Sequence, residues 1–386
     1  MNFAPVLPLE SLYIHWPFCP YKCHFCPFVA LASHDHFMED YHRALCTEIK
    51  RFVAHHPVES EIQTIFLGGG TPSTYPEPLL LDMFDILNNE FKISPQAEIT
   101  IEVNPGTVTL DKLHTWKNCG INRLSIGVQS LNEKVLKQLN RHQSIHDVTT
   151  LLEAASELFT NISVDLMVGL PDVHECEWKD ILAQVVTWPL QHISIYFLTV
   201  HEDTPLYFKV LNNLVKLPAD DMIVDLYLWS INYVQDYNLY QYEVSNFAKP
   251  GFESRHNQQY WNYAAYKGFG LGACSFDGIS RFQNQKNLTN YCQNIEHNKD
   301  ITLFYETLTH KQRSLEKLML GLRQTKGVHI QSLYQELTSE QRAKCQDLLE
   351  VFKGMALIQE KNGYAQLTVS GLAVENEVIT KLATVL

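Results

Sequence analysis

The stretch YIHWPFCPYKCHFCPF, residues 13–28, contains Cys19, Cys23 and Cys26 with the spacing C-x3-C-x2-C. Three thiolates are one fewer than a closed tetrahedral zinc site uses and one more than a single disulfide needs. They can instead hold three irons of a [4Fe–4S] cluster and leave the fourth iron open to an external chelator. A short loop with this spacing can wrap three corners of such a cluster. The cysteines therefore predict an iron–sulfur site with one vacant corner.

A structural zinc loop is the alternative interpretation of the same cysteines. It requires one further ligand from the nearby histidines His15, His24 or His34. No second Cys or His pair follows at a spacing typical of zinc sites, which favours the cluster. The other six of the nine cysteines are scattered singly, as expected for small buried side chains in a reducing compartment.

The elements that must position this loop follow an alternating pattern through the first two hundred residues. Short apolar, β-branched runs, separated by longer amphipathic segments, occupy residues 11–16, 64–70, 98–105, 123–130, 162–171 and 192–200. Such alternation predicts βα units and a parallel sheet, and six units fit a partial or full (β/α) barrel. Polar or special residues stand at the strand ends, where the βα loops of a barrel converge: Gly68–Thr71, Glu102, Asn104, Gln129, Asp165 and Thr199.

Three domains are expected from the change of pattern along the chain. Residues 1–205 form the barrel, residues 206–305 an extension rich in Tyr, Phe and Asn, and residues 306–386 a helical, winged-helix-like domain with a hairpin. The 30 basic and 43 acidic residues give a net charge of −13, which argues against nucleic-acid binding. We see no secretory signal and no membrane span, so the expected location is the cytoplasm, or a peripheral place at the inner face of the membrane.

The cysteine loop directly after a first strand, with Phe25 before the last cysteine, resembles the radical S-adenosylmethionine (SAM) superfamily. The resemblance implies that SAM chelates the open iron and is cleaved by one electron to a 5′-deoxyadenosyl radical. The sequence GGGTPS after a strand resembles the glycine motif that meets the SAM amino group, and Gly69, Gly70 and Thr71 match it. On its own this sequence is compatible with any βα turn.

Further SAM contacts follow from the same resemblance. Glu102 in IEVNP is placed to accept from the ribose hydroxyls, unless it is a solvated loop carboxylate. Arg141 in LNRHQS matches the arginine that pairs with the SAM carboxylate, for which a planar fork suits best. The remaining matches are Tyr13, Gln129, Asp165 and, by spacing only, Thr199.

The motifs in this order resemble a narrower group, the oxygen-independent coproporphyrinogen III oxidase family. They span nearly the whole chain, from YIHWPFC to EKLMLGLRQTKGV, and imply a partial (β/α)6 TIM-like barrel with a small C-terminal HemN domain. The true oxidase has a fourth cysteine, as C-x3-C-x2-C-x-C, where this chain has Phe28. A heme chaperone branch of the family has phenylalanine at that position. The oxidase also tends to carry an N-terminal extension, whereas only twelve residues precede Tyr13 here. Many chaperones have Asp before that phenylalanine; Pro27 here removes an N–H that would help set the cluster potential.

The sequence HNQQYW, residues 256–261, matches the H-N-x-x-Y-W motif of the chaperone branch. An imidazole is a common axial ligand of heme iron, so His256 is the expected heme-binding residue, with aromatic neighbours stacking on the macrocycle. The plainer interpretation is that His256 caps a turn and the aromatic residues pack in the core.

The function implied by the resemblance is that of a heme chaperone, which holds heme as cargo and passes it to a recipient hemoprotein. The alternatives are coproporphyrinogen oxidation and SAM-dependent heme-opening methyl transfer, and whether the protein is an enzyme is left open. The expected partners are heme or a porphyrin, a recipient hemoprotein, an electron donor such as flavodoxin or ferredoxin, and a second copy in a homodimer.

Overall fold

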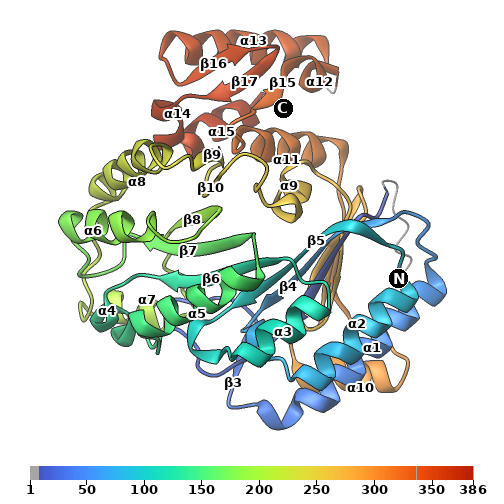
Figure 1. Ribbon diagram of the computed structural model, residues 1–386. Coiled ribbons are helices and arrows are strands. Elements are labelled where there is room, and N and C mark those ends of the chain that lie inside the picture. The colour runs from blue at the N-terminus through green and yellow to red at the C-terminus, as the bar shows by residue number, and fades with distance from the viewer. Residues whose placement is uncertain (1–7, 336, 386) are drawn as a thin grey trace.

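A curved nine-stranded sheet with helices along its outer side forms the centre of the molecule (Figure 1). The computed structural model describes residues 8–335 and 337–385. The strand order is β11-β1-β4-β5-β6-β7-β8-β10-β9. Its parallel core consists of β1 (Ser11–Trp16), β4 (Ile62–Gly69), β5 (Ile93–Val103), β6 (Arg123–Gln129), β7 (Ile162–Val168) and β8 (His192–Phe197).

Helices follow the core strands in chain order and cover the outer side of the sheet (Figure 1). They are α1 (Met38–His55), α2 (Glu77–Glu90), α3 (Leu110–Asn118), α4 (Glu133–Gln138), α5 (Ile145–Leu158) and α6 (Glu175–Val185). The helix α5 begins with a capping box between Ser144 and Asp147, which satisfies two otherwise unpaired amide groups. The predicted α/β class and the partial six-unit barrel are confirmed.

The segment after β8 completes both edges of the sheet. At one edge, β10 (Asn246–Ala248) runs antiparallel to β8 and carries β9 (Tyr240–Glu243). At the other edge, β11 (Lys267–Phe269) is parallel to β1. The same segment supplies α7 (Pro205–Leu211), α8 (Asp220–Gln235), α9 (Arg255–Trp261), α10 (Leu288–Glu296), and the antiparallel sheet of β12 (Cys274–Phe276), β13 (Ser280–Asn284) and β14 (Thr302–Thr307).

The C-terminal part has a hydrophobic core of its own. It contains α11 (His310–Leu322), α12 (Ile330–Gln335), α13 (Ser339–Gly354), α14 (Val369–Ala373) and α15 (Glu375–Ala383), and a sheet in the order β15 (Val328–His329), β17 (Tyr364–Leu367), β16 (Ile358–Lys361). Asn362 and Gly363 both have positive φ angles, as a tight hairpin turn requires. Within the described part of the chain, no helix is both long and apolar enough to span a bilayer.

Glu48 joins the barrel to the extension. This α1 residue is 5% exposed and accepts from Gly270 N (2.8 Å), Asn284 Nδ2 (2.9 Å) and Tyr291 Oη (2.7 Å). It also pairs with Lys267 Nζ at 3.2 Å. Burial lowers the pKa of Lys267, and the Glu48 carboxylate opposes that shift. One carboxylate therefore ties α1 to β11, β13 and α10.

We predict that Glu48→Ala lowers the free energy of unfolding by about 3–5 kcal/mol, because it leaves the Lys267 charge and several donors buried without a partner. Urea denaturation at neutral pH measures this loss. Glu157→Ala, which removes an exposed glutamate from α5, is the control and should change the value by less than about 0.5 kcal/mol. A loss below about 1 kcal/mol for Glu48→Ala would contradict the role given to Glu48.

Candidate functional site

A cavity of about 500 Å³ lies at the carboxyl ends of the core strands, and twelve of the fourteen residues expected to bind a cofactor or metal line it. These are Cys19, Phe25, Cys23, Cys26, Gly69, Gly70, Thr71, Glu102, Gln129, Arg141, Asp165 and Thr199. The structure thus brings together residues from the cysteine loop and from β4, β5, β6, β7 and the loop after β8. Tyr13 lines a neighbouring cavity, and His256 lines neither of the two.

The cysteine loop is held by the barrel on several sides. Cys19 ends β2 (Phe18–Cys19), which pairs with β3 (Leu31–Ala32), and its sulfur accepts from Thr71 Oγ1 at 3.2 Å. The His24 amide donates to Leu139 O at 2.9 Å. Arg141 Nη1 lies 3.8 Å from Cys23 Sγ. The loop is therefore fixed by β4 and by the segment around α4, and all three cysteines line one cavity.

The spacing of the three sulfurs bears on what they can hold. Among the described residues, these sulfurs do not form, alone or with a histidine, a set of three ligand atoms lying within 4.8 Å of one another. A tetrahedral zinc ion with bonds of about 2.0–2.3 Å would require a closer set. The arrangement fits a larger group that three separated thiolates can grip, and it disfavours the zinc alternative.

Burial favours the protonated form of Cys19 and Cys26 while no cation is near. It raises the pKa of Cys19 to about 11, helped by the neighbouring thiols of Cys26 and Cys23, and it raises the pKa of Cys26. A thiolate must form before it can bind iron, so a positively charged group has to displace these protons. The donor set therefore fits a [4Fe–4S] cluster, and its loading is expected to release protons.

The glycine motif allows the cysteine loop to lie against the end of β4. The Gly70 and Thr71 amides donate to Trp16 O (2.8 Å) and Phe18 O (2.9 Å). A Cβ atom at Gly70 would lie 2.4 Å from Pro17 O, and Gly69 has a φ of +122°. The Gly69 amide donates to Glu102, so all three N–H groups of the motif already have acceptors. A ligand ammonium is itself a donor and would bind carbonyl or carboxylate oxygens.

Two carboxylates share the interior of the cavity. Glu102 accepts from the Gly69 amide at 3.1 Å, while burial and the Asp165 charge raise its pKa to about 8. Asp165 accepts from Ser125 Oγ at 3.1 Å, and burial raises its pKa despite the nearby arginines. Carboxylates in this position can accept hydrogen bonds from ligand hydroxyl or amine groups, and they favour a ligand that carries positive charge.

Arg141 is already partly bound by the protein. Its Nε donates to Gln143 Oε1 at 2.9 Å, and its Nη2 donates to Gly127 O. A Cβ at Gly127 would lie 3.0 Å from Arg141 Nη2, so the glycine makes room for the guanidinium. Gln129 ends β6 with a φ of +66°, an unusual conformation for this residue type that accompanies a register shift between β6 and β7.

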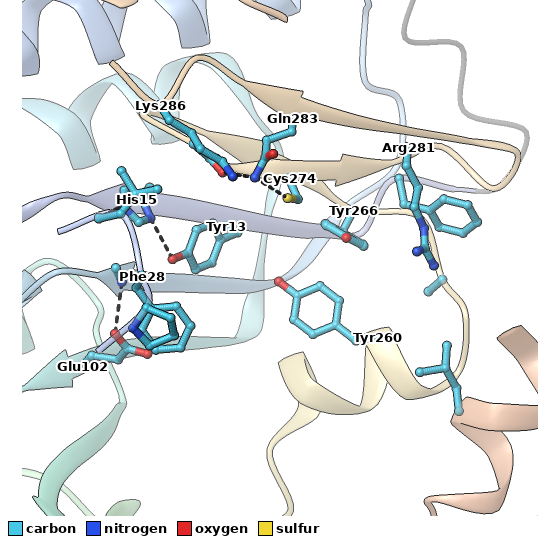
Figure 2. A pocket seen from close by; sticks show the side chains of 18 of the residues that line it. Tyr13, His15, Phe28, Glu102, Tyr260, Tyr266, Cys274, Arg281, Gln283 and Lys286 are labelled. Carbon is cyan, nitrogen blue, oxygen red and sulfur yellow. Dashed lines mark hydrogen bonds between the residues drawn. The ribbon is translucent and has the colours of Figure 1, made fainter. Parts of the chain in front are cut away.

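A second cavity, of about 610 Å³, adjoins the first. Pro27, Phe28, Gly69 and Glu102 line both, so the two cavities meet at these residues. Phe28 is 65% exposed although it is a large apolar side chain. Figure 2 shows the second cavity, with Tyr260 projecting from α9 between Tyr13 and Tyr266.

The far wall of the second cavity comes from β12 and β13. Cys274, Arg281, Gln283 and Lys286 line it, together with apolar side chains such as Phe276. Arg281 Nη2 forms an ion pair with Glu316 Oε2 at 2.8 Å. The cavity therefore combines aromatic walls with two cationic side chains.

His256 lies inside the barrel beside this cavity. It is 1% exposed, and its ring nitrogens are hydrogen-bonded to Thr64 Oγ1 (2.7 Å) and Tyr260 Oη (2.8 Å). Its ring stacks on Phe66, with centroids 5.1 Å apart. Burial lowers the pKa of His256 to about 3, so the imidazole is neutral. Tyr260 stands between His256 and the cavity, and direct binding of iron by His256 stays a prediction.

Several cavity residues were not singled out from the sequence. Arg123 and Ser125 line the first cavity from inward positions of β6, and Arg123 Nε has no hydrogen-bond partner among the described residues. The alternation of Arg123, Ser125, Gly127 and Gln129 in RLSIGVQ could have indicated an inward polar face. Residues of β12 and β13 belong to no recognisable motif, and no pattern pointed to them.

Comparisons with known proteins agree with this geometry. The family model of the radical SAM superfamily matches residues 13–185, and that of the HemN C-terminal domain matches residues 308–374. The chain is 32% identical to the heme chaperone HemW of Bacillus subtilis, covering 96% of this chain and 98% of the relative. It is 36% identical to HemW of Escherichia coli, over 69% of this chain and 70% of the relative.

Among solved structures, coproporphyrinogen III oxidase (HemN) from Escherichia coli, described as a radical SAM enzyme, superposes with a TM-score of 0.85 at 25% identity. The match covers 100% of this chain and 92% of that structure. Similarity over nearly the full length of both sequence and structure leaves one conclusion. The chain belongs to the HemW family within the radical SAM superfamily.

Proposed function

We propose that the protein is a heme chaperone: it binds heme next to a [4Fe–4S] cluster with SAM and delivers the heme to hemoproteins. The observation that carries this proposal is the junction of two cavities, one lined by the three cysteines and one by aromatic and cationic side chains. The names of the HemW relatives support the same function. Phe28 stands at the junction, where the oxidase motif would have a further cysteine.

The cofactors would be held by the residues of the first cavity. Cys19, Cys23 and Cys26 would hold the cluster, and Glu102 and Arg141 would hold the ribose and the carboxylate of SAM. When bound, the cluster and SAM supply one-electron chemistry. The chain itself positions the cofactor, accepts hydrogen bonds from it through Glu102 and Asp165, and limits access of water because the cavity floor is closed by buried strands.

The second cavity is the proposed heme site. Its volume of about 610 Å³ is in the range of small-molecule sites, and its aromatic walls suit a flat apolar macrocycle. Arg281 and Lys286 would pair with carboxylates at the edge of the porphyrin through charge-assisted hydrogen bonds. Tyr13, which resembles a SAM-contacting residue, lines this cavity and would lie between cofactor and cargo.

His256 and Tyr260 would act on the heme iron as a pair. Tyr260 exposes its side chain to the cavity, and its hydroxyl lies 2.8 Å from His256 Nε2. This hydrogen bond would hold the Tyr260 oxygen in position, and the phenol proton would leave to solvent when the oxygen binds iron, since tyrosinate is a known heme ligand. Direct ligation by His256, as expected from the motif, would require Tyr260 to leave Nε2.

The remaining parts of the proposal concern partners. We infer a recipient hemoprotein that accepts heme from the second cavity, and an electron donor such as flavodoxin or ferredoxin that serves the cluster. A homodimer and a cytoplasmic place of action, with or without contact to the inner membrane face, stay predictions. Coproporphyrinogen oxidation and heme-opening methyl transfer are the enzymatic alternatives.

The function predicts that the porphyrin leaves the protein unchanged. Protein with an anaerobically rebuilt cluster is incubated with SAM and either heme or coproporphyrinogen, and the porphyrins are then analysed by mass spectrometry. We expect heme to bind, to keep its mass and to appear in an added heme-free acceptor protein. Decarboxylated coproporphyrinogen would support the oxidase instead, and a linear, methylated product would support the methyltransferase.

Tyr260→Phe and His256→Ala should each weaken heme binding about tenfold or more and shift the Soret band, because both remove the hydrogen-bonded pair that faces the iron. Spectroscopic titration with heme measures both effects. Tyr263→Phe is the matched control: Tyr263 lines the same cavity, but its hydroxyl bonds Glu316. Wild-type affinity and spectra in both variants would refute the proposed ligand pair.

The raised pKa of Glu102 predicts a pH-dependent effect of Glu102→Gln in the protein without cofactors. The pKa of this carboxyl is about 8 in the folded protein and 4.5 in the unfolded chain, so the folded state resists losing the proton. The free energy of unfolding of the wild type therefore falls as the pH rises from 4.5 to about 8. The variant lacks that loss. Urea denaturation should give similar values near pH 5 and a growing advantage of the variant toward pH 9.

The control for this pH effect is Glu157→Gln, which changes an exposed carboxyl. It should follow the wild-type dependence at every pH. If the free energies of unfolding of Glu102→Gln and of the wild type differed by a constant amount between about pH 5 and pH 9, Glu102 would not have the raised pKa.

A further inference from the structure

A group of three metal-ligating side chains lies behind the cluster loop, outside both cavities. His42 and Cys46 are one turn apart on α1, and Asp82 is on α2. These three are the set, among the described residues, whose ligand atoms all lie within 4.8 Å of one another. The structure thus concentrates an imidazole, a thiol and a carboxylate where two helices pack together.

The distances between these ligand atoms are close to those around a tetrahedral zinc ion. Cys46 Sγ lies 3.5 Å from His42 Nε2 and 3.9 Å from Asp82 Oδ2. His42 Nε2 lies 2.9 Å from Asp82 Oδ2. Zinc bonds of about 2.0–2.3 Å at tetrahedral angles place neighbouring ligand atoms about 3.3–3.7 Å apart. The three distances are within about half an ångström of such a set, and Cys46 Sγ must in addition move away from Nδ1, from which it lies 3.7 Å.

The surroundings of the histidine fit the same site. His42 Nδ1 lies 2.8 Å from the hydroxyl oxygen of Tyr75, which is buried. A zinc-bound imidazole commonly donates its other N–H to an oxygen, which fixes the ring and leaves Nε2 free for the metal. Here Tyr75 can accept from Nδ1–H while Nε2 binds.

Access and the fourth ligand come from the side of Asp82. His42 and Cys46 are buried, whereas the Asp82 side chain is 59% exposed. An ion can therefore enter past Asp82, and water can occupy the fourth position. The thiol proton leaves to solvent when the Zn–S bond forms, and the carboxylate and the thiolate together balance the charge of Zn²⁺.

A cysteine nucleophile with a His–Asp pair is the competing interpretation of these residues. In that arrangement the thiol and the carboxylate bind opposite ring nitrogens, so that a proton can pass through the imidazole. Here Asp82 bonds Nε2 and Tyr75 occupies Nδ1, while Cys46 Sγ lies at similar distances from the two ring nitrogens, 3.5 Å from Nε2 and 3.7 Å from Nδ1. Because both ring nitrogens already have oxygen partners, the thiol has no nitrogen of its own and a catalytic relay is disfavoured. For a metal ion, the Cys46 side chain has to turn toward Nε2.

We propose that His42, Cys46 and Asp82 form a zinc site, completed by water, that ties α1 to α2. Tyr75 links the site to the cluster loop, since its ring stacks on Trp16 with centroids 3.7 Å apart. Trp16 ends β1 and precedes Cys19 by three residues. Bound zinc therefore braces the strand that leads into the cysteine loop. The proposal does not depend on the heme function.

The test uses the full chain with Cys19, Cys23 and Cys26 all changed to Ser, so that no ion binds at the cluster loop. Titration with Co²⁺, which replaces Zn²⁺ and absorbs visible light, should give one equivalent with a thiolate-to-cobalt charge-transfer band. Zn²⁺ should displace it and raise the thermal unfolding temperature. The unaltered chain with its cluster should contain about one zinc per molecule by metal analysis.

Three further variants in that background identify the ligands. Cys46→Ser should abolish the charge-transfer band, and Asp82→Asn should weaken Co²⁺ binding about tenfold or more. Asp82→Asn is expected to fold, because its amide oxygen can still accept from His42 and the position is exposed. Cys119→Ser, which changes a half-buried thiol near α3, should leave the band unchanged.

Two results would overturn the zinc site. One is the absence of a thiolate band in the background protein, with binding only of the weak kind that dialysis removes, which would mark an adventitious ion only. The other is a band that persists in both Cys46→Ser and Asp82→Asn, which would place the metal on a different cysteine.

Discussion

The close contact between the end of β4 and the cysteine loop is the constraint on which the site depends. Gly70 N and Thr71 N donate to the backbone of Trp16 and Phe18, and Thr71 Oγ1 donates to Cys19 Sγ. A Cβ atom at Gly70 would meet the Pro17 carbonyl at 2.4 Å, so only glycine permits this approach. Because the same turn supplies the Gly69 amide to Glu102, one short segment positions both Cys19, which is expected to bind the cluster, and a carboxylate that is expected to bind the cofactor.

A second constraint acts at the interior of the barrel, which is polar and must be filled. Glu98 of β5 accepts from the amides of Arg255 (3.0 Å) and His256 (2.9 Å), so a carboxylate caps the N-terminal end of α9. This anchor fixes α9 inside the sheet, with His256 stacked on Phe66. Asn257 lines the first cavity and Tyr260 lines the second, so the HNQQYW helix forms part of the wall between the two.

Much of this architecture can be predicted from the order of apolar, polar and turn-forming residues along short stretches of the sequence. The first strand was expected at 11–16 and is found there, and the Asn362–Gly363 turn produces the expected hairpin. The strand expected at 98–105 begins earlier, at Ile93, because the register shift beside Pro95 lets the chain continue across a residue that cannot donate to the ladder. Local motifs also identified twelve residues of one cavity, because the ends of parallel strands meet at one edge.

What local pattern could not predict arises from pairings of distant segments. The strands β10 and β11 join opposite edges of the sheet, and neither has a spacing that reveals its partner. The second cavity depends on these pairings, since its walls combine residues near 13–28 with residues near 260–286. Motif resemblance associated His256 with heme, but only the fold shows Tyr260 standing between His256 and the cavity.

The two cavities differ in the side chains that line them, and both contain acidic and basic groups. In the first cavity Glu102 and Asp165 stand beside Arg123 and Arg141, which suits a zwitterionic cofactor that carries a sulfonium and a carboxylate. The second cavity combines aromatic walls with Lys286 and with Arg281, which is paired with Glu316. Glu102 stands at the junction, and its raised pKa shows that an unneutralised charge there is costly. A cationic cofactor would relieve that cost by stabilising the ionised carboxylate. Cofactor binding would thereby set the charge that the porphyrin meets at Phe28, which couples the two cavities without any movement of the backbone.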